Sequence, residues 1–133
     1  MDREVAEWLA ELIAQAVAAL EHQPGLTCEV QGDATRWIQI LPEQDDVPGQ
    51  VSGIVLNFAY RHQEEPLAVL KRAGLTLPPG TRVETWEAGG YATLWVRPDI
   101  PVVALALFVG DIVEKVMEAP AGYELQAWIE YGY

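Results

Sequence analysis

The chain has 133 residues, and its 8 Lys and Arg against 20 Asp and Glu give a net charge of −12. This charge argues against binding to nucleic acids or to anionic membranes, because both kinds of binding need basic patches. Half of the residues are hydrophobic, which excludes a disordered acidic tail and predicts a single domain, residues 1–133, with one hydrophobic core.

We expect neither a membrane span nor a targeting segment. The longest apolar stretch, residues 100–110, is shorter than the ~20 residues that a membrane-spanning helix needs. Glu4, Glu7 and Glu11 occupy the place where a signal peptide would have its apolar segment. We therefore expect a cytoplasmic protein.

The N-terminal segment predicts an amphipathic helix. Apolar residues recur from Val5 to Leu20 at intervals of three and four, and acidic residues fall on the opposite side. Asp2 is suited to cap the start of this helix, and Pro24-Gly25 is expected to end it.

The pattern then changes to the alternation of strands. Residues 26–30 and 37–40 alternate apolar and polar side chains. A three-residue turn at Gly32–Ala34 would pair Cys28 with Ile38. This register keeps the apolar side chains of both strands on one face, and so we expect it.

The middle of the chain predicts a loop, a strand and a short helix. Residues 42–50 are polar, whereas residues 51–60 are apolar on both faces, as in a central strand that is covered on both sides. Pro66 is suited to the first turn of a helix and Gly74 to its C-terminal end, so we expect a short helix between them.

The last part of the chain predicts a strand pair, a long helix and a final strand. Thr81–Glu87 and Tyr91–Arg97 are expected to pair around a glycine-containing turn. Asp99 is expected to cap a helix that runs to Glu118 and is apolar on almost every side in its first half, so this helix should be buried from more than one side. Residues 123–131 alternate as a closing strand.

The expected order of elements is α-β-β-β-α-β-β-α-β. Because paired strands follow each other closely along the chain, we expect an α+β fold, a largely antiparallel sheet with the helices packed on one face. The expected core joins the two long helices to Cys28, Ile38, Ile40, Leu56, Phe58, Leu94, Val96, Leu125 and Ile129.

No combination of residues predicts catalysis, a metal site or a cofactor site. Cys28 is expected to be a small buried hydrophobe, because no basic residue beside it in the sequence would lower the pKa of its thiol. His22 and His62 have no Cys or His at metal-ligand spacing. The loop with Glu43, Asp45 and Asp46 lacks the alternating oxygen ligands of an EF-hand. We expect the protein not to be an enzyme.

The aromatic residues are the feature that points to a function. Strand alternation places large aromatic side chains among charged ones on the face opposite the helices, and the expected partner-binding residues are Trp37, Trp86, Tyr91, Trp95 and Trp128. Trp86 and Trp95 share this face if the turn between their strands has two residues. Aromatic side chains among charged ones are typical of interfaces. The alternative is that they only stabilise the sheet, or are covered within the monomer.

In element order, size and acidity the chain resembles the class I chaperones of type III secretion and the related YbjN-type bacterial proteins. The resemblance covers residues 2–22, 26–60, 66–74, 81–97 and 99–118. It implies a homodimer that binds an extended segment of a client protein without chemistry. The strand at residues 123–131 is an addition to the family's pattern.

A small-molecule-binding or regulatory domain is the alternative function. Its ligand would bind in a pocket between the helix at residues 100–118 and the sheet. The apolar surface of this helix, together with the tryptophan-bearing face, exceeds what one pair of layers normally covers. We therefore expect a homodimer.

Overall fold

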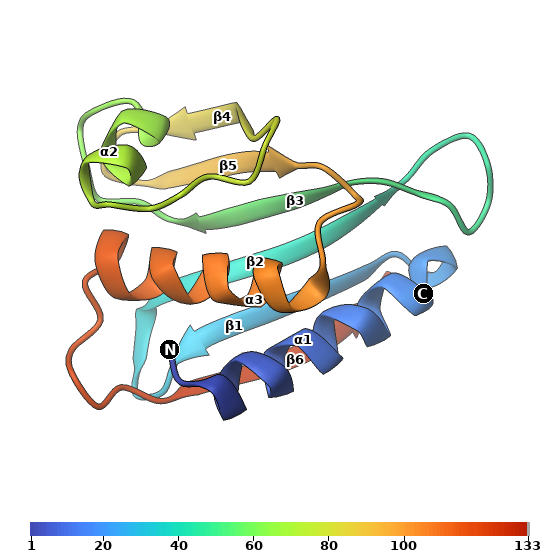
Figure 1. Cartoon of the computed structure of the whole chain (residues 1–133), viewed down its shortest axis with the longest axis horizontal. Helices are drawn as coiled ribbons and strands as arrows, with labels where there is room; N and C mark the ends of the chain where they lie inside the picture. Colours follow the sequence, from blue (N-terminus) through green and yellow to red (C-terminus); the bar gives the residue numbers. More distant parts are fainter. Residues whose placement is uncertain (133) are drawn as a thin grey trace.

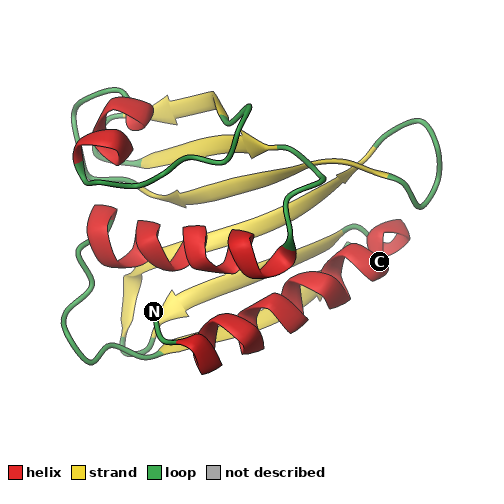
Figure 2. Ribbon diagram, viewed as in Figure 1, coloured by secondary structure: helices red, strands yellow, loops and turns green. Residues whose placement is uncertain are grey.

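The computed structural model describes residues 1–132 and contains a six-stranded antiparallel sheet with its helices on one side (Figures 1 and 2). The strand order is β4-β5-β3-β2-β1-β6. In chain order the elements are α1 (Arg3–Ala18), the 3-10 helix η1 (Leu20–His22), β1 (Pro24–Val30), β2 (Asp33–Gln44), β3 (Val51–Ala59), α2 (Pro66–Arg72), β4 (Arg82–Glu87), β5 (Tyr91–Val96), α3 (Val102–Asp111), the π-helical turn η2 (Ile112–Val116) and β6 (Leu125–Tyr131). The α+β prediction is confirmed.

Helix α1 begins as predicted but ends earlier. The carboxylate of Asp2 accepts a hydrogen bond from the backbone nitrogen of Val5 at 2.9 Å, as an N-cap does. The helix ends at Ala18, and the chain turns into β1 at Gln23, which has a left-handed φ of 52°. The prediction that Pro24 ends the helix is wrong, because this proline already belongs to β1.

The hairpin of β1 and β2 has the predicted register but a different turn. Cys28 pairs with Ile38, as expected. The turn is shorter than three residues, because Val30 pairs with Asp33, and residues 34–36 bulge out before regular pairing resumes. The apolar pattern therefore sets the register, and the bulge takes up the surplus length of β2.

The loop between β2 and β3 is shorter than the predicted residues 42–50. Strand β2 continues to Gln44 and pairs with β3 along this extension. Pro42 lies beyond the last pair of β1 and β2, which is Leu26 with Ile40. A strand with a neighbour on one side only tolerates proline, so the extension is compatible with this residue.

Helix α2 is short and is held at both ends, as predicted. Pro66 occupies its first turn, and the Glu65 carboxylate accepts hydrogen bonds from the backbone nitrogens of Leu67 at 3.1 Å and Ala68 at 3.0 Å. Gly74 follows its end with a left-handed φ of 91°, a conformation that favours glycine.

Helix α3 differs from the prediction at its start, and its outer side is exposed. Pro101 precedes its first residue and no side chain caps it, whereas Asp99 forms an ion pair with Arg97 at 2.7 Å. Val103 and Leu107 are each 44% exposed. The helix is therefore buried against the sheet and α1 but not on its outer side.

The core lies between the helices and one face of the sheet, which we call the covered face; the other is the open face. The fully buried residues of the predicted core are Cys28, Ile38, Ile40, Leu56, Phe58, Leu94 and Val96. Leu125 and Ile129 are only half-buried, because β6 lies at the edge of the sheet. No helix formed by residues 1–132 lies on the open face (Figure 2).

Candidate functional site on the open face

Three of the four tryptophans assigned to the open face lie there. Trp37 and Trp95 alternate with buried neighbours that point to the covered face, and Trp128 pairs with Thr27, which alternates in the same way. Tyr91 lies four residues before Trp95 on β5, so the alternation of side chains places both on the same face. Trp128 is 37% exposed, whereas the other three aromatic side chains are half-buried.

Trp86 lies on the covered face, so its assignment to the open face is wrong. The hairpin of β4 and β5 turns through residues 88–90, and Trp86 pairs with Ala92. A three-residue turn pairs even positions with even ones, which separates Trp86 from Trp95. The Trp86 ring instead packs edge-on against Tyr60, with 6.1 Å between the ring centroids.

A shallow hollow of about 660 Å³ lies at the centre of the open face. It is lined by Trp37, Leu41, Val55, Asn57, Gly90, Tyr91 and Thr93. Trp37 on β2 and Tyr91 on β5 flank it, because both strands pair with β3. Strand order thus brings together two aromatic residues that are far apart along the chain.

A row of hydrogen-bonded side chains crosses this hollow. Thr93 Oγ1 donates to Asn57 Oδ1 at 2.9 Å, and Asn57 Nδ2 donates to Gln39 Oε1 at 3.2 Å. The three residues lie next to one another because they are direct partners in the strand ladder. The row holds both amides in defined orientations and places polar groups between the aromatic rings.

The Trp95 ring is held from two sides. A Cβ atom at Gly53 would come within 2.1 Å of Trp95 Nε1, so only glycine leaves room for the indole. The guanidinium carbon of Arg82 lies 4.0 Å from the ring centroid, a cation–π contact. Arg82 reaches the ring because the register shift between Val83 and Thr85 places it opposite Trp95.

The open face carries acidic groups at its margins. Glu29 on β1 and Glu130 on β6 have the alternation of this face, and Glu130 Oε1 accepts a hydrogen bond from Trp128 Nε1 at 2.9 Å. The positive charge of Arg82 is balanced by Glu84, whose Oε1 lies 3.4 Å from its Nη2. The margins of the face therefore carry negative charge at Glu29 and Glu130.

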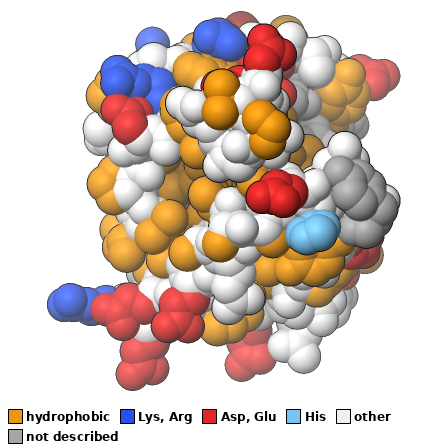
Figure 3. Space-filling model, turned by 90° about the vertical axis from the view of Figure 1, so that its right-hand side faces the viewer, with side chains coloured by type: hydrophobic (Ala, Val, Ile, Leu, Met, Phe, Trp, Pro, Cys, Tyr) orange, Lys and Arg blue, Asp and Glu red, His pale blue; other side chains and the backbone are white. Residues whose placement is uncertain are grey.

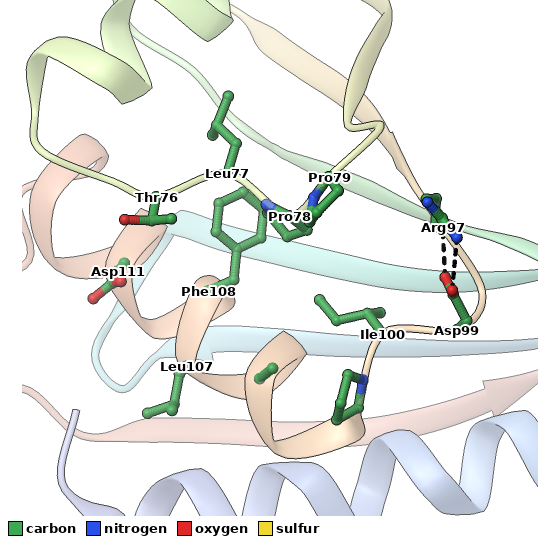
Figure 4. Close-up of a pocket in the computed structure, with 12 residues that line it drawn as sticks. Thr76, Leu77, Pro78, Pro79, Arg97, Asp99, Ile100, Leu107, Phe108 and Asp111 are labelled. Atoms are coloured by element: carbon green, nitrogen blue, oxygen red, sulfur yellow. Dashed lines mark hydrogen bonds and ion pairs between the residues drawn. The ribbon is translucent and has the colours of Figure 1, made fainter.

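A second cavity, of about 510 Å³, lies on the helical side, between α3 and the loop that joins α2 to β4 (Figure 4). Its lining is mostly apolar and includes Leu77, Pro78, Ile100, Ala104, Leu107 and Phe108. The Arg97–Asp99 ion pair lies at one end. On the end of the molecule drawn in Figure 3, hydrophobic side chains gather on the left half between charged side chains above and below.

The side chains considered for catalysis are buried or make contacts within the fold. Cys28 is fully buried, as predicted, and burial raises the pKa of its thiol from 9.0 to about 12. His62 Nε2 lies 3.0 Å from the carbonyl oxygen of Val116, at the end of η2. The His22 ring packs edge-on against Tyr131.

Within residues 1–132, His, Cys, Asp and Glu form no group of three or more that could hold a metal ion. Over the same residues, no helix combines the length and the apolar character needed to cross a bilayer.

Sequence reasoning missed the polar row and the support of Trp95. Gln39, Asn57 and Thr93 alternate with buried residues, so their common face was predictable, but their alignment depends on strand order. The contact of Trp95 with Gly53 was indicated by the sequence, because a glycine inside an apolar strand often marks the close approach of another group.

Comparison of the chain with family models, with curated proteins and with solved structures gives no match.

Proposed function

We propose that this chain is a non-enzymatic protein-binding domain that holds an extended segment of a client protein against its open face. The observation that carries this proposal is the set of four aromatic side chains, Trp37, Tyr91, Trp95 and Trp128, on a sheet face without a covering helix among residues 1–132. The resemblance to secretion chaperones implies the same activity.

The composition of the open face supports a binding role. A sheet face exposed to water normally carries mostly polar side chains. Here Leu41 and Val55 line the central hollow and lie in line with Trp95 across the strands, which leaves apolar area for a partner to cover. Tryptophan side chains are enriched among the residues that contribute most to binding, because they bury a large area and lose little rotamer entropy.

The geometry favours contacts through side chains. The central strands already have neighbours on both sides, so a client cannot add as a strand in the middle of the sheet. The hollow between Trp37 and Tyr91 is of a size to receive apolar side chains of the client. The amides of Asn57 and Gln39 lie beside it and can bind the client's backbone.

The charge of the protein favours a neutral or basic client. The net charge is −12, and Glu29 and Glu130 lie at the margins of the open face. Opposite charges raise the rate of association at low salt and disfavour acidic competitors.

Two synthetic peptides test this proposal. In one, Leu alternates with Lys; in the other, Leu alternates with Glu. We expect the Lys peptide to bind more tightly in a tryptophan-fluorescence titration. Trp37→Ala and Trp95→Ala should each weaken its binding about tenfold, the loss typical of a central aromatic contact.

Leu107→Ala provides the matched control, because Leu107 is an exposed hydrophobe on the helical side. This variant should bind the Lys peptide with unchanged affinity. The proposal fails if neither peptide binds, or if Leu107→Ala weakens binding as much as Trp37→Ala and Trp95→Ala do in folded protein.

The second candidate function is binding of a small apolar molecule, favoured by the cavity of about 510 Å³ beside α3. A thermal-shift screen with fatty acids and aromatic metabolites tests it, because a specific ligand raises the melting temperature. Ala104→Trp, which fills the cavity, should abolish such a shift. A shift that persists in this variant would place the ligand elsewhere.

The proposed form of the protein is a cytoplasmic homodimer. Apolar side chains remain exposed on α1, α3 and β6, and association would cover part of them. Sedimentation equilibrium that gives 14.7 kDa, the mass of one chain, over the micromolar range would contradict the homodimer.

A further inference from the structure

We infer that the free edge of β6 is the place where a second copy of this chain joins, by antiparallel pairing of β6 with its counterpart about a two-fold axis at Trp128. This inference rests on the homodimer part of the proposed function. It shares Trp128 with the client-binding face but does not require a client to bind. The two sheets would become one continuous sheet.

The two edges of the sheet differ in how they are protected. Strand β4 has a register shift between Val83 and Thr85 and carries the charges of Arg82, Glu84 and Glu87. Irregularity and charge of this kind block pairing with another strand. Strand β6, in contrast, pairs with β1 in a regular register from Leu125 to Tyr131 and shows no bulge.

Within residues 1–132, the backbone groups of β6 that lack a strand partner belong to its odd-numbered residues. The carbonyl of Glu124 accepts a hydrogen bond from the backbone nitrogen of Gln31, and the nitrogen of Gly132 donates to the carbonyl of His22. Even-numbered positions therefore face β1. The backbone groups of Ala127 and its odd-numbered neighbours point outward, where a second β6 can pair with them.

The charges on β6 favour a two-fold axis at Trp128. This register places Gln126 opposite Glu130 of the second copy, a pair of a neutral and an acidic side chain. An axis one residue earlier, at Ala127, would place Glu124 opposite Glu130 twice, and like charges in opposite positions destabilise a sheet. Trp128 faces its own counterpart in the favoured register, and aromatic cross-strand pairs are stabilising.

Apolar groups left exposed at this edge support a second copy as the occupant. Of the six large hydrophobic side chains exposed within residues 1–132, Trp128 and Tyr131 lie on β6 and Trp8 lies on α1. Trp8 and Leu125 line the same cavity of about 590 Å³ beside the edge. A two-fold axis at β6 would bring the two α1 helices side by side and cover these groups on both copies.

Cysteine cross-linking tests the register. In the favoured register Trp128 and its counterpart form a pair without backbone hydrogen bonds between them. The Cα atoms of such a pair lie about 4.5 Å apart, within the range of a disulfide. We expect Trp128→Cys to form a disulfide-linked dimer under mild oxidation. The native chain is the control, because its one cysteine, Cys28, is fully buried.

A second pair of variants covers the case in which Trp128→Cys fails to fold. Gln126→Cys and Glu130→Cys should not cross-link alone, because each would lie about 13 Å from its own counterpart. A mixture of the two should cross-link. Cross-linking of either variant alone, without the mixture, would indicate another register.

Ala127→Pro tests the pairing without a new thiol. It removes an outward N–H group and should leave the contacts of β6 with β1 intact, as proline does on an edge strand. We expect a folded monomer by circular dichroism and sedimentation equilibrium.

The outcomes separate this inference from the proposals above. A dimeric chain that shows no cross-link at these positions, and that stays dimeric with Ala127→Pro, overturns pairing at β6 but leaves the homodimer standing. A chain that is monomeric throughout the micromolar range overturns both. The peptide titration decides the client-binding face in either case.

Discussion

Leu56 lies in the middle of the sheet, fully buried between its ladder partners Ile40 and Leu94. Leu56→Ala should lower the free energy of unfolding by ~2–5 kcal/mol, because it removes buried methyl groups and leaves a cavity. Urea unfolding measures this loss. The neighbour Val55 lies half-buried on the open face, and Val55→Ala should cost about 1 kcal/mol or less. Equal losses would contradict the assignment of faces.

Cys28 links stability to pH. Burial raises the pKa of its thiol from 9.0 to about 12. Above pH 9.0 the unfolded chain releases this proton and the folded chain retains it, so the free energy of unfolding should fall by about 1.4 kcal/mol per pH unit up to about pH 12. Urea titrations at several pH values measure this, and Cys28→Ala should remove the part of the loss that falls between pH 9 and pH 10.

Tyr60 limits the pH range in which the effect of Cys28 on the free energy of unfolding can be measured separately. Burial, with a smaller contribution from Glu65 and Glu64, raises the pKa of Tyr60 from 10.0 to about 12. The tyrosine therefore adds its own loss of stability above pH 10.0. A native chain whose stability is flat between pH 9 and pH 10, like that of Cys28→Ala, would contradict the burial of the thiol.

At the scale of elements, helix α2 depends on its N-cap. The Glu65 carboxylate satisfies the backbone nitrogens of Leu67 and Ala68. Glu65→Ala should lower the free energy of unfolding by about 1 kcal/mol, as the loss of a cap does. Glu64→Ala is the control, because it removes only an exposed ion pair with Arg72, worth about 0–1 kcal/mol.

Hydrogen exchange can locate the effect of the Glu65 change. The amides of α2 should exchange faster in Glu65→Ala, whereas those of β2 and β3 should keep their protection relative to global stability. Uniformly faster exchange across the sheet, with no excess in α2, would show that Glu65 does not act through this helix.

At the scale of the whole molecule, the net charge of −12 opposes the compact state through self-repulsion. The melting temperature should therefore rise from low to physiological ionic strength, because salt screens this repulsion. The double variant Glu4→Gln/Glu11→Gln removes two exposed charges from α1 and should show a smaller rise. A melting temperature that falls with added salt would contradict the expectation.

Local sequence patterns determined the elements and most of their faces. The periodicity of α1, the Pro66 and Gly74 signals of α2 and the alternation around Cys28 each act within a few residues, so they could be interpreted without long-range contacts. The seven fully buried residues of the predicted core follow from the same patterns, because burial of apolar side chains on one face is the main stabilising force.

Tertiary structure decided what depends on pairing between strands. Trp86 lies on the covered face instead of the predicted open face. The reason is that its hairpin turns through three residues rather than two, so even-numbered positions pair with even-numbered ones. Strand order placed Gln39, Asn57 and Thr93 in one row, and edge position left Leu125 half-buried. Turn length, bulges and strand order are set by contacts between distant segments, whose small free-energy differences are not encoded in any single local pattern.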